Sequence, residues 1–218
     1  MTSRAKKNGA RRKQRENARL QASSAAPAQA TQPTAAATID AAFGACWVSD
    51  GWDDLHDPDL VGVVVTRTLA DGRLLPGFAL VDRTCLGVKD GFVGKSLSVA
   101  EVATFVSRIG LPHGGMLECE PVVALSIVFH ALDYARKLGF EPHADFPAEV
   151  FGPRPSDLRD TPWCAPERPL YIAGPYDDVD AVVRQLTSAV GEGNYDARKD
   201  CLVHEHYATD VEARTPTC

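Results

Sequence analysis

Residues 61–80 read VGVVVTRTLADGRLLPGFAL, and this stretch predicts a β-hairpin. β-Branched residues fill most of Val61–Leu69, which is typical of a strand. Asp71 and Gly72 form a strong hairpin-turn signal, because glycine adopts a positive φ at little cost. The return run continues as LLPGFALVDRTCLGV, and Pro76 predicts an edge or a bulge there because proline cannot donate to a ladder. The folded domain is therefore expected to contain a sheet that opens with this hairpin.

The first of three predicted helices follows the hairpin and is marked at both ends. Ser98 fits the N-cap position and Glu101 the third helical position of a capping box. Val102, Phe105, Val106 and Ile109 follow at helical spacing and form one apolar stripe. Gly110 is the expected stop.

The second and third helices are marked in the same way. Pro121 suits a first helical position because it has no N–H to leave unbonded, and Gly139 is the expected end of that helix. Its polar stripe consists of Ser126, His130, Asp133 and Lys137. The third helix follows a short strand, PLYIAG, with Asp177 as its expected N-cap and Gly191 as its stop.

This order of elements predicts an α+β domain with a small, mainly antiparallel sheet and three helices packed on one of its faces. Residues 1–20 are expected to form a basic arm. Residues 21–40 are expected to be a disordered linker, since the low-complexity run QASSAAPAQATQPTAAAT cannot bury enough apolar surface to offset the entropy of ordering. A single domain is expected at 41–207, with a possible short final strand in 200–210, and a flexible tail at 208–218.

Charge divides the chain more sharply than its net value of −6 indicates. Residues 1–20 contain eight lysines and arginines against one glutamate, a net charge of +7, so the rest of the chain sums to −13. A flexible basic arm attracts phosphates without sequence preference, so nucleic acid is one predicted partner; a solubilising basic terminus is the alternative. The residues expected to contact phosphates are Lys6, Lys7, Arg11, Arg12, Lys13, Arg15 and Arg19.

No apolar run reaches the roughly 18–20 residues that span a bilayer, and the basic N-terminus lacks the apolar stretch of a secretory signal. A cytoplasmic protein without membrane contact is therefore expected, with an arginine-rich organelle presequence as the alternative. The six cysteines form no C-x-x-C pair, which favours reduced thiols over a disulfide framework or a metal finger.

Asp82 is the first candidate for chemistry. It shares strand parity with Phe78 and Leu80, so it is expected to point inward near the end of the sheet. A buried carboxylate needs hydrogen bonds or a charged partner. It is either a catalytic base or metal ligand, or an aspartate that bonds the backbone of a turn.

Glu118 and Glu120 flank Cys119 just before the second helix. In an extended segment both carboxylates face one side, and with Asp82 and Asp145 they would supply oxygens to a hard divalent metal ion. The alternative is that acids are favoured near a helix N-terminus by the helix dipole. No other cofactor is indicated, because the glycine-rich nucleotide-binding patterns are absent.

His143 and Asp145 alternate in the stretch GFEPHADF, residues 139–146. As a catalytic pair, the carboxylate would orient and charge the imidazole. As a structural loop, Asp145 would accept backbone N–H groups instead. A further pair, His204 and His206, has the spacing of two metal ligands on one face of a strand, but no further ligand can be named.

Three blocks resemble a group of uncharacterised bacterial proteins that share them in this order: LVDRTCLGVKD, YARKLGFEPHADF and LYIAGPYDD. The resemblance covers roughly residues 60–195 and implies that the blocks belong to one domain. It implies no activity, cofactor or site.

Two functions and one structural role follow as hypotheses, the structural role being an oligomerising scaffold with no ligand. The first is an accessory protein whose basic arm contacts nucleic acid or another anionic partner, while its acidic body contacts protein. The second is a metal-dependent hydrolase or nuclease that uses Asp82, Glu118, Glu120, His143 and Asp145, with the metal activating water.

Overall fold

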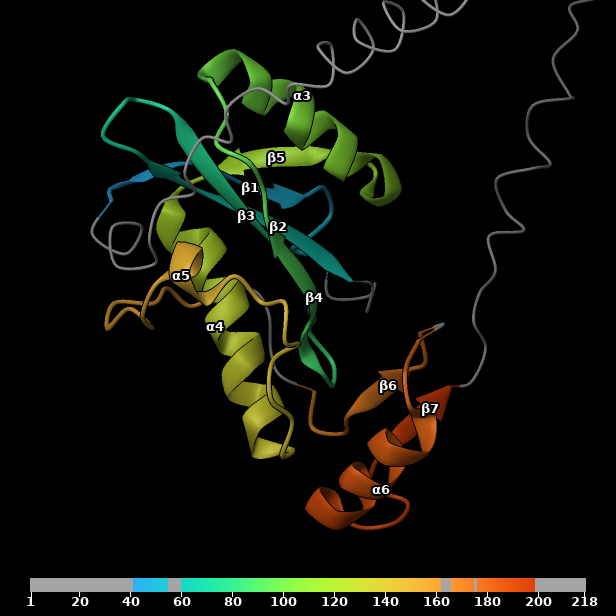
Figure 1. Ribbon diagram of the computed structural model, residues 1–218. Coiled ribbons are helices and arrows are strands. Elements are labelled where there is room, and N and C mark those ends of the chain that lie inside the picture. The colour runs from blue at the N-terminus through green and yellow to red at the C-terminus, as the bar shows by residue number, and fades with distance from the viewer. Residues whose placement is uncertain (1–40, 55–59, 162–165, 175, 199–218) are drawn as a thin grey trace, which may run out of the picture. The chain divides into compact units, whose positions relative to one another are not determined.

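The computed structural model describes residues 41–54, 60–161, 166–174 and 176–198 (Figure 1). The predicted basic arm and linker, the His204 and His206 pair, the possible strand in 200–210 and the predicted tail lie outside these residues. All of the described residues belong to one compact unit of the chain.

The central element is a five-stranded antiparallel sheet in the order β4-β3-β2-β1-β5. The predicted hairpin is confirmed, since β2 and β3 pair from Val61–Val81 to Thr68–Leu74 around the turn at Gly72. The strands are β1 (Phe43–Ser49), β2 (Val61–Thr68), β3 (Leu74–Asp82), β4 (Gly87–Val93) and β5 (Met116–Cys119).

The sheet differs from the prediction at both ends of the hairpin. It does not open with the hairpin, because β1 precedes it and pairs with β2 on one side and with β5 on the other. The return run is two strands, β3 and β4, divided by a turn after Asp82. The oxygen Oδ1 of Asp82 accepts the backbone N–H groups of Thr84 at 2.8 Å and Cys85 at 3.0 Å, and this stabilises the turn.

Four α-helices lie within the described residues, one more than predicted. The added one is the single turn α5. The helices are α3 (Val99–Gly110), α4 (Pro121–Lys137), α5 (Ala148–Phe151) and α6 (Val179–Val190).

Helix α3 confirms its predicted beginning and corrects its predicted end. The backbone N–H of Ser98 donates to Glu101 Oε2 at 2.7 Å, and the N–H of Glu101 donates to Ser98 Oγ at 3.4 Å, which is the capping box. Gly110 is not the stop, because its φ of −73° is helical and the chain continues into a 3-10 turn at Leu111–His113. The left-handed residue is Gly114, with φ +73°.

Helix α4 begins at Pro121 and ends before Gly139, as predicted. Gly139 has φ +81°, and the N–H groups of Gly139 and Phe140 bond the carbonyls of Arg136 and Ala135, both at 3.0 Å. The segment that follows α5 binds to the polar stripe of α4. There the N–H of Arg159 donates to Ser126 Oγ at 2.9 Å, and Arg154 pairs with Asp133 at 2.9 Å.

The helices cover both faces of the sheet, so the expectation of one covered face is wrong. Val61, Val63 and Val65 pack with α4 in one core cluster, whereas Val64 packs with Val102 and Val106 of α3 in another. Figure 1 shows α3 on one side of the sheet and α4 with α5 on the other. A strand covered on both faces explains why β2 carries consecutive valines instead of alternating polar residues.

A third core cluster joins the C-terminal elements to the end of α4. Strands β6 (Leu170–Ile172) and β7 (Asp196–Arg198) pair in parallel, and Tyr171 packs with Leu186 of α6 and Leu138. The N-cap of α6 is Asp178, whose Oδ1 accepts the Ala181 N–H at 3.0 Å, so the prediction of Asp177 is wrong by one residue.

Asp177 instead binds β4. Its Oδ2 lies 2.8 Å from Lys89 Nζ, and it also accepts from the Gly174 N–H at 2.8 Å and the Tyr171 hydroxyl at 3.1 Å. Lys89 donates as well to the carbonyl of Ile172 at 3.3 Å. The side chain of Lys89 is 14% exposed and that of Asp177 is 15% exposed, so this ion pair links the C-terminal elements to the sheet away from bulk water.

Arg67 is a buried cation held by carbonyl groups. It is 4% exposed and donates to the carbonyls of Val150 at 2.7 Å, Ala41 at 2.9 Å and Phe151 at 3.3 Å. Its guanidinium lies 3.5 Å from the centre of the Phe43 ring. Arg67 therefore joins β2, the entry to β1 and the end of α5.

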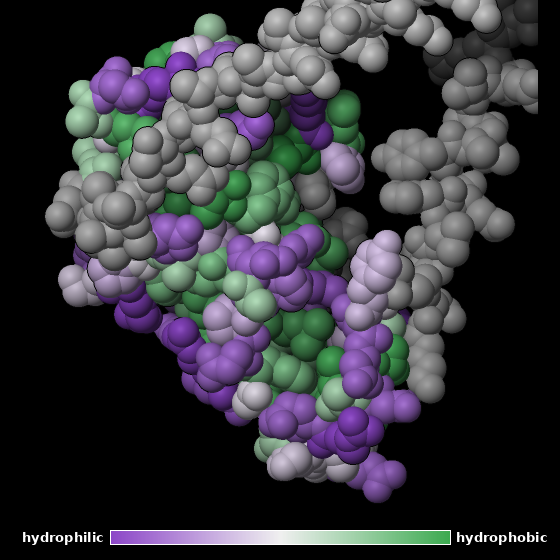
Figure 2. All heavy atoms as spheres, viewed as in Figure 1, coloured by the Kyte–Doolittle hydropathy of each residue, from purple (hydrophilic) through white to green (hydrophobic). Residues whose placement is uncertain are grey.

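On the face seen in Figure 2, hydrophilic and hydrophobic residues are interspersed over the domain. Few large apolar side chains of the described residues are exposed; among them are Val99 and Leu111, at the two ends of α3. No helix among the described residues is long and apolar enough to cross a membrane.

Candidate metal centre

The edge strand β4 contains an irregularity that places two polar residues. Leu80 pairs with Asp90 and Val81 pairs with Val88, so Lys89 is an extra residue in β4 and forms a β-bulge. A bulge re-aims the side chains around it. Here Lys89 reaches Asp177, and Asp90 stands exposed at the sheet edge.

The loop after α4, residues 139–147, lies along this edge. The N–H of His143 donates to the Val88 carbonyl at 3.0 Å, which continues the hydrogen bonding of β4 outward. Gly91 permits the close approach, because a Cβ there would lie 2.9 Å from Pro147 Cδ and 3.3 Å from the Asp145 carbonyl oxygen. The loop and β4 therefore present their side chains to each other.

The result is a cluster of three ligand-type side chains, Asp90, His143 and Asp145. One ligand atom from each lies within 4.8 Å of the other two. His143 Nδ1 is 3.9 Å from Asp90 Oδ1 and 3.8 Å from Asp145 Oδ2. It is the only such group of three or more His, Cys, Asp and Glu side chains in the described part of the chain.

The donor set fits a divalent transition metal ion. Imidazole nitrogen and carboxylate oxygen bind such ions at about 2.0–2.2 Å, which separates tetrahedral neighbours by about 3.4 Å. The two distances from His143 Nδ1 exceed this by about half an ångström, and all three donor atoms lie within 4.8 Å, so a metal ion would draw the exposed side chains closer together.

The imidazole nitrogen of the cluster already has a partner. The Asp145 N–H donates to His143 Nδ1 at 3.3 Å, which occupies the single in-plane lone pair of this nitrogen, so a metal ion would have to displace that long bond. Asp90 Oδ1 accepts the Gly91 N–H at 2.7 Å, which fixes its carboxylate. With side-chain exposures of 45–73%, the cluster is open to water and to substrates.

Of the five residues predicted for a metal site, the structure brings His143 and Asp145 together, and Asp82 is not in their group. Asp82 is buried and its Oδ1 accepts three hydrogen bonds, from Thr84 N, Thr84 Oγ1 and Cys85 N. These contacts match the turn-stabilising alternative for Asp82.

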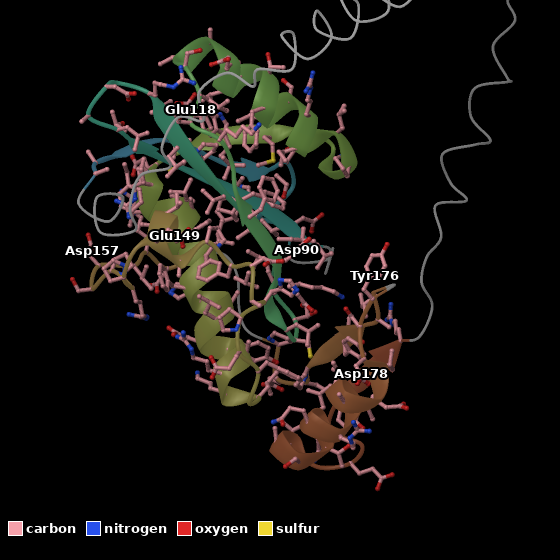
Figure 3. The ribbon with its side chains drawn as sticks, in the orientation of Figure 1. Asp90, Glu118, Glu149, Asp157, Tyr176 and Asp178 are labelled. Atoms are coloured by element: carbon pink, nitrogen blue, oxygen red, sulfur yellow. The ribbon has the colours of Figure 1, made fainter. Side chains whose placement is uncertain are left out.

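Glu118 and Glu120 also stand apart from the cluster. Glu118 lines a hollow of about 420 Å³ between α3 and the sheet, together with Trp47 and Val102. Figure 3 shows Glu118 beside α3, well separated from Asp90. Glu120 is the N-cap residue of α4, and its Oε2 lies 2.5 Å from Arg159 Nη2.

Asp90 was missed because its role depends on two features that are not local. The bulge at Lys89 aims it, and the loop that it faces begins about fifty residues further along the chain. The one available signal was the pair Asp90-Gly91, in which the glycine permits close backbone approach.

The hollow beside α3 is not the cluster, and none of its lining residues is Asp90, His143 or Asp145. It is lined mainly by apolar side chains, whereas the cluster consists of polar, exposed side chains. We place the candidate site at the cluster because, within the part of the chain that the structure describes, groups with metal-binding chemistry converge only there.

Comparison with protein-family models, with curated proteins and with solved structures finds no match. The resemblance of the three sequence blocks to bacterial proteins stays a prediction. A function for the cluster must therefore be argued from its own chemistry.

Proposed function

We propose that the folded domain binds a divalent transition metal ion through Asp90, His143 and Asp145. The observation that carries this proposal is the convergence of three donor atoms, from β4 and from the loop after α4, within 4.8 Å. In this set of one imidazole and two carboxylates, the imidazole suits ions such as Zn²⁺ and the carboxylates suit Mn²⁺.

Three protein ligands at an exposed place leave coordination positions for water or for a phosphate oxygen. A metal ion bound there would lower the pKa of a coordinated water and polarise a phosphoryl group. This supports the metal-dependent hydrolase or nuclease, with His143 and Asp145 kept from the predicted set and Asp90 added. A catalytic role for Asp82, Glu118 or Glu120 gains no support from their positions.

The first prediction concerns Mn²⁺ binding, followed by the loss of the electron paramagnetic resonance signal of the free ion. Mn²⁺ is chosen because it prefers oxygen and imidazole ligands to thiols. Asp90→Asn, Asp145→Asn and His143→Ala are each expected to weaken binding at least tenfold, about 1.4 kcal/mol. Replacing all three should abolish it.

The control is Asp157→Asn, an exposed aspartate that Figure 3 shows well apart from Asp90. All titrations use a chain carrying His204→Ala and His206→Ala, so that this pair contributes no binding. Unchanged Mn²⁺ affinity in the three site variants would exclude the cluster as the metal site.

The second candidate function is contact with nucleic acid through residues 1–20, favoured by their net charge of +7 against −13 elsewhere. Phosphate neutralisation by lysine and arginine releases counterions, so the binding should be steeply salt-dependent. In this proposal the protein is a cytoplasmic accessory factor, and its acidic body is free for a protein partner.

Deleting residues 1–20 is expected to abolish binding to nonspecific DNA or RNA at low salt. For the full chain, the logarithm of affinity should fall with the logarithm of salt concentration at a slope of about −5 to −7, if six to eight phosphates are neutralised. Fluorescence anisotropy with a labelled oligonucleotide measures both. Equal affinity of the full and shortened chains would remove this function.

A further inference from the structure

We infer that Cys46 and Cys119 form a cross-strand dithiol that closes to a disulfide under oxidising conditions. Cys46 lies in β1 and Cys119 in β5, and the two residues are direct partners in the antiparallel register. Direct partners have Cα atoms about 4.5–5.5 Å apart. Disulfides bridge Cα separations of about 4.4–6.8 Å.

The two side chains also share one side of the sheet. Cys46 is fully buried in the core cluster that contains α4, and Cys119 packs against that same cluster. Their neighbours, Trp47 and Glu118, form the next pair in the register and line the hollow on the opposite face. The two thiols are therefore adjacent, and both contact the core cluster that contains α4.

The surroundings of the two thiols slow their oxidation, and they make Cys119 react before Cys46. Burial raises the pKa of Cys46 to about 12 and the pKa of Cys119 to about 11. The backbone N–H of Ala124, at the start of α4, favours the thiolate of Cys119. Cys119 is also only partly buried, so it is the thiol that an external reagent meets first.

With oxidised glutathione as the oxidant, the chemistry balances in two exchanges. The Cys119 thiolate attacks one sulfur of oxidised glutathione, which forms a mixed disulfide and releases one glutathione thiolate. The Cys46 thiolate then attacks Cys119 Sγ, forms the Cys46–Cys119 bond and releases the second thiolate. The two protons lost by the protein thiols are taken up by the two glutathione thiolates.

Cys85 is the internal comparison. Cys85 is as fully buried as Cys46, and burial raises the pKa of its thiol. It lies, however, in the separate core cluster with Tyr134, Leu138 and Tyr171. A reagent that oxidised buried thiols indiscriminately would act on Cys85 as well. The proposal predicts a disulfide only between Cys46 and Cys119, which are partners in the strand register.

The experiment uses the full chain with Cys164, Cys201 and Cys218 replaced by serine, so that only three cysteines remain. After treatment with oxidised glutathione at pH 8.5, peptide mapping by mass spectrometry is expected to find one internal disulfide, Cys46–Cys119, which dithiothreitol reverses. Cys46→Ser and Cys119→Ser should each remove it, and Cys85→Ser should not. Below pH 9 the initial rate should rise about tenfold per pH unit, because only the thiolate attacks.

The same oxidation in concentrated urea is the control for the fold, since an unfolded chain should yield a mixture of the possible pairings. Selective Cys46–Cys119 linkage in buffer and mixed linkage in urea supports the proposal. Glutathione retained on Cys119 with Cys46 free, a dimer linked through Cys119, or the same mixture in buffer as in urea would each overturn it.

Discussion

Replacing Arg67 with methionine is expected to lower the free energy of unfolding by about 3 kcal/mol. The change leaves the carbonyls of Val150, Phe151 and Ala41 without their donor, and a buried unsatisfied polar group costs about 1–3 kcal/mol. Removing a buried charge offsets part of this cost, because the guanidinium no longer has to be desolvated. The loss of three bonds outweighs that gain, since methionine supplies no donor.

Urea unfolding followed by tryptophan fluorescence measures the effect. The matched control is Arg136→Met, where an exposed arginine lies 3.7 Å from Asp133, an arrangement worth less than about 1 kcal/mol. Arg67→Lys should fall between the two, because a lysine keeps the charge but lacks the guanidinium fork that reaches several carbonyls. If Arg67→Met and Arg136→Met unfold at the same urea concentration, the carbonyl contacts contribute nothing.

Replacing Asp177 with alanine is expected to cost about 2–3 kcal/mol at neutral pH and to change how stability depends on pH. Lys89 would be left largely buried with only the Ile172 carbonyl as its partner, and the Tyr171 hydroxyl and the Gly174 N–H would each lose an acceptor. Asp180→Ala, which changes an exposed acid in the first turn of α6, is the control and should cost well under 1 kcal/mol.

The acid dependence has a definite sign. Burial acts to raise the pKa of Asp177, but the bonds from Lys89, Gly174 and Tyr171 and the charge of Lys89 outweigh it, so the pKa lies below its ordinary value. The stabilisation by Asp177 is therefore present above the unfolded-state pKa of about 3.9 and is lost as pH falls through the lower folded-state pKa. The difference in unfolding free energy between the natural chain and Asp177→Ala should thus shrink below about pH 4. A difference that stays constant from pH 7 to pH 3 would contradict this linkage.

The parts of the fold that could be predicted are those encoded within a few residues. The hairpin turn at Gly72, the capping box of Ser98 and Glu101 and the end of α4 at Gly139 each depend on local backbone chemistry. The predicted end of α3 was wrong because Gly110 adopts a helical φ and is the last residue of the helix, with a 3-10 turn directly after it.

The parts that could not be predicted depend on pairing between distant segments. Strand β1 was not recognised as a strand, since its position in the sheet depends on partners in β2 and β5. The β-branched run of β2 indicated a strand, but not that α3 and α4 cover it from opposite sides. Asp177 was placed as a helix cap because the sequence does not show that Lys89 is its partner.

The candidate site was half predictable for the same reason. His143 and Asp145 remained once the cap at Gly139 accounted for the start of their loop, and both lie in the cluster. Asp90 joins them through a bulge and a contact between segments about fifty residues apart. Asp82 was singled out correctly as a buried carboxylate, and its partners are the backbone groups of a turn.

The loop at 139–147 has a consequence for self-association. An uncovered edge strand offers free N–H and C=O groups to another chain and so promotes aggregation. At β4 the His143 N–H already occupies the Val88 carbonyl, and at the other edge β5 has only four residues. The segment that carries two of the proposed metal ligands therefore also blocks strand addition, so changes that detach this loop would reduce solubility as well as metal affinity.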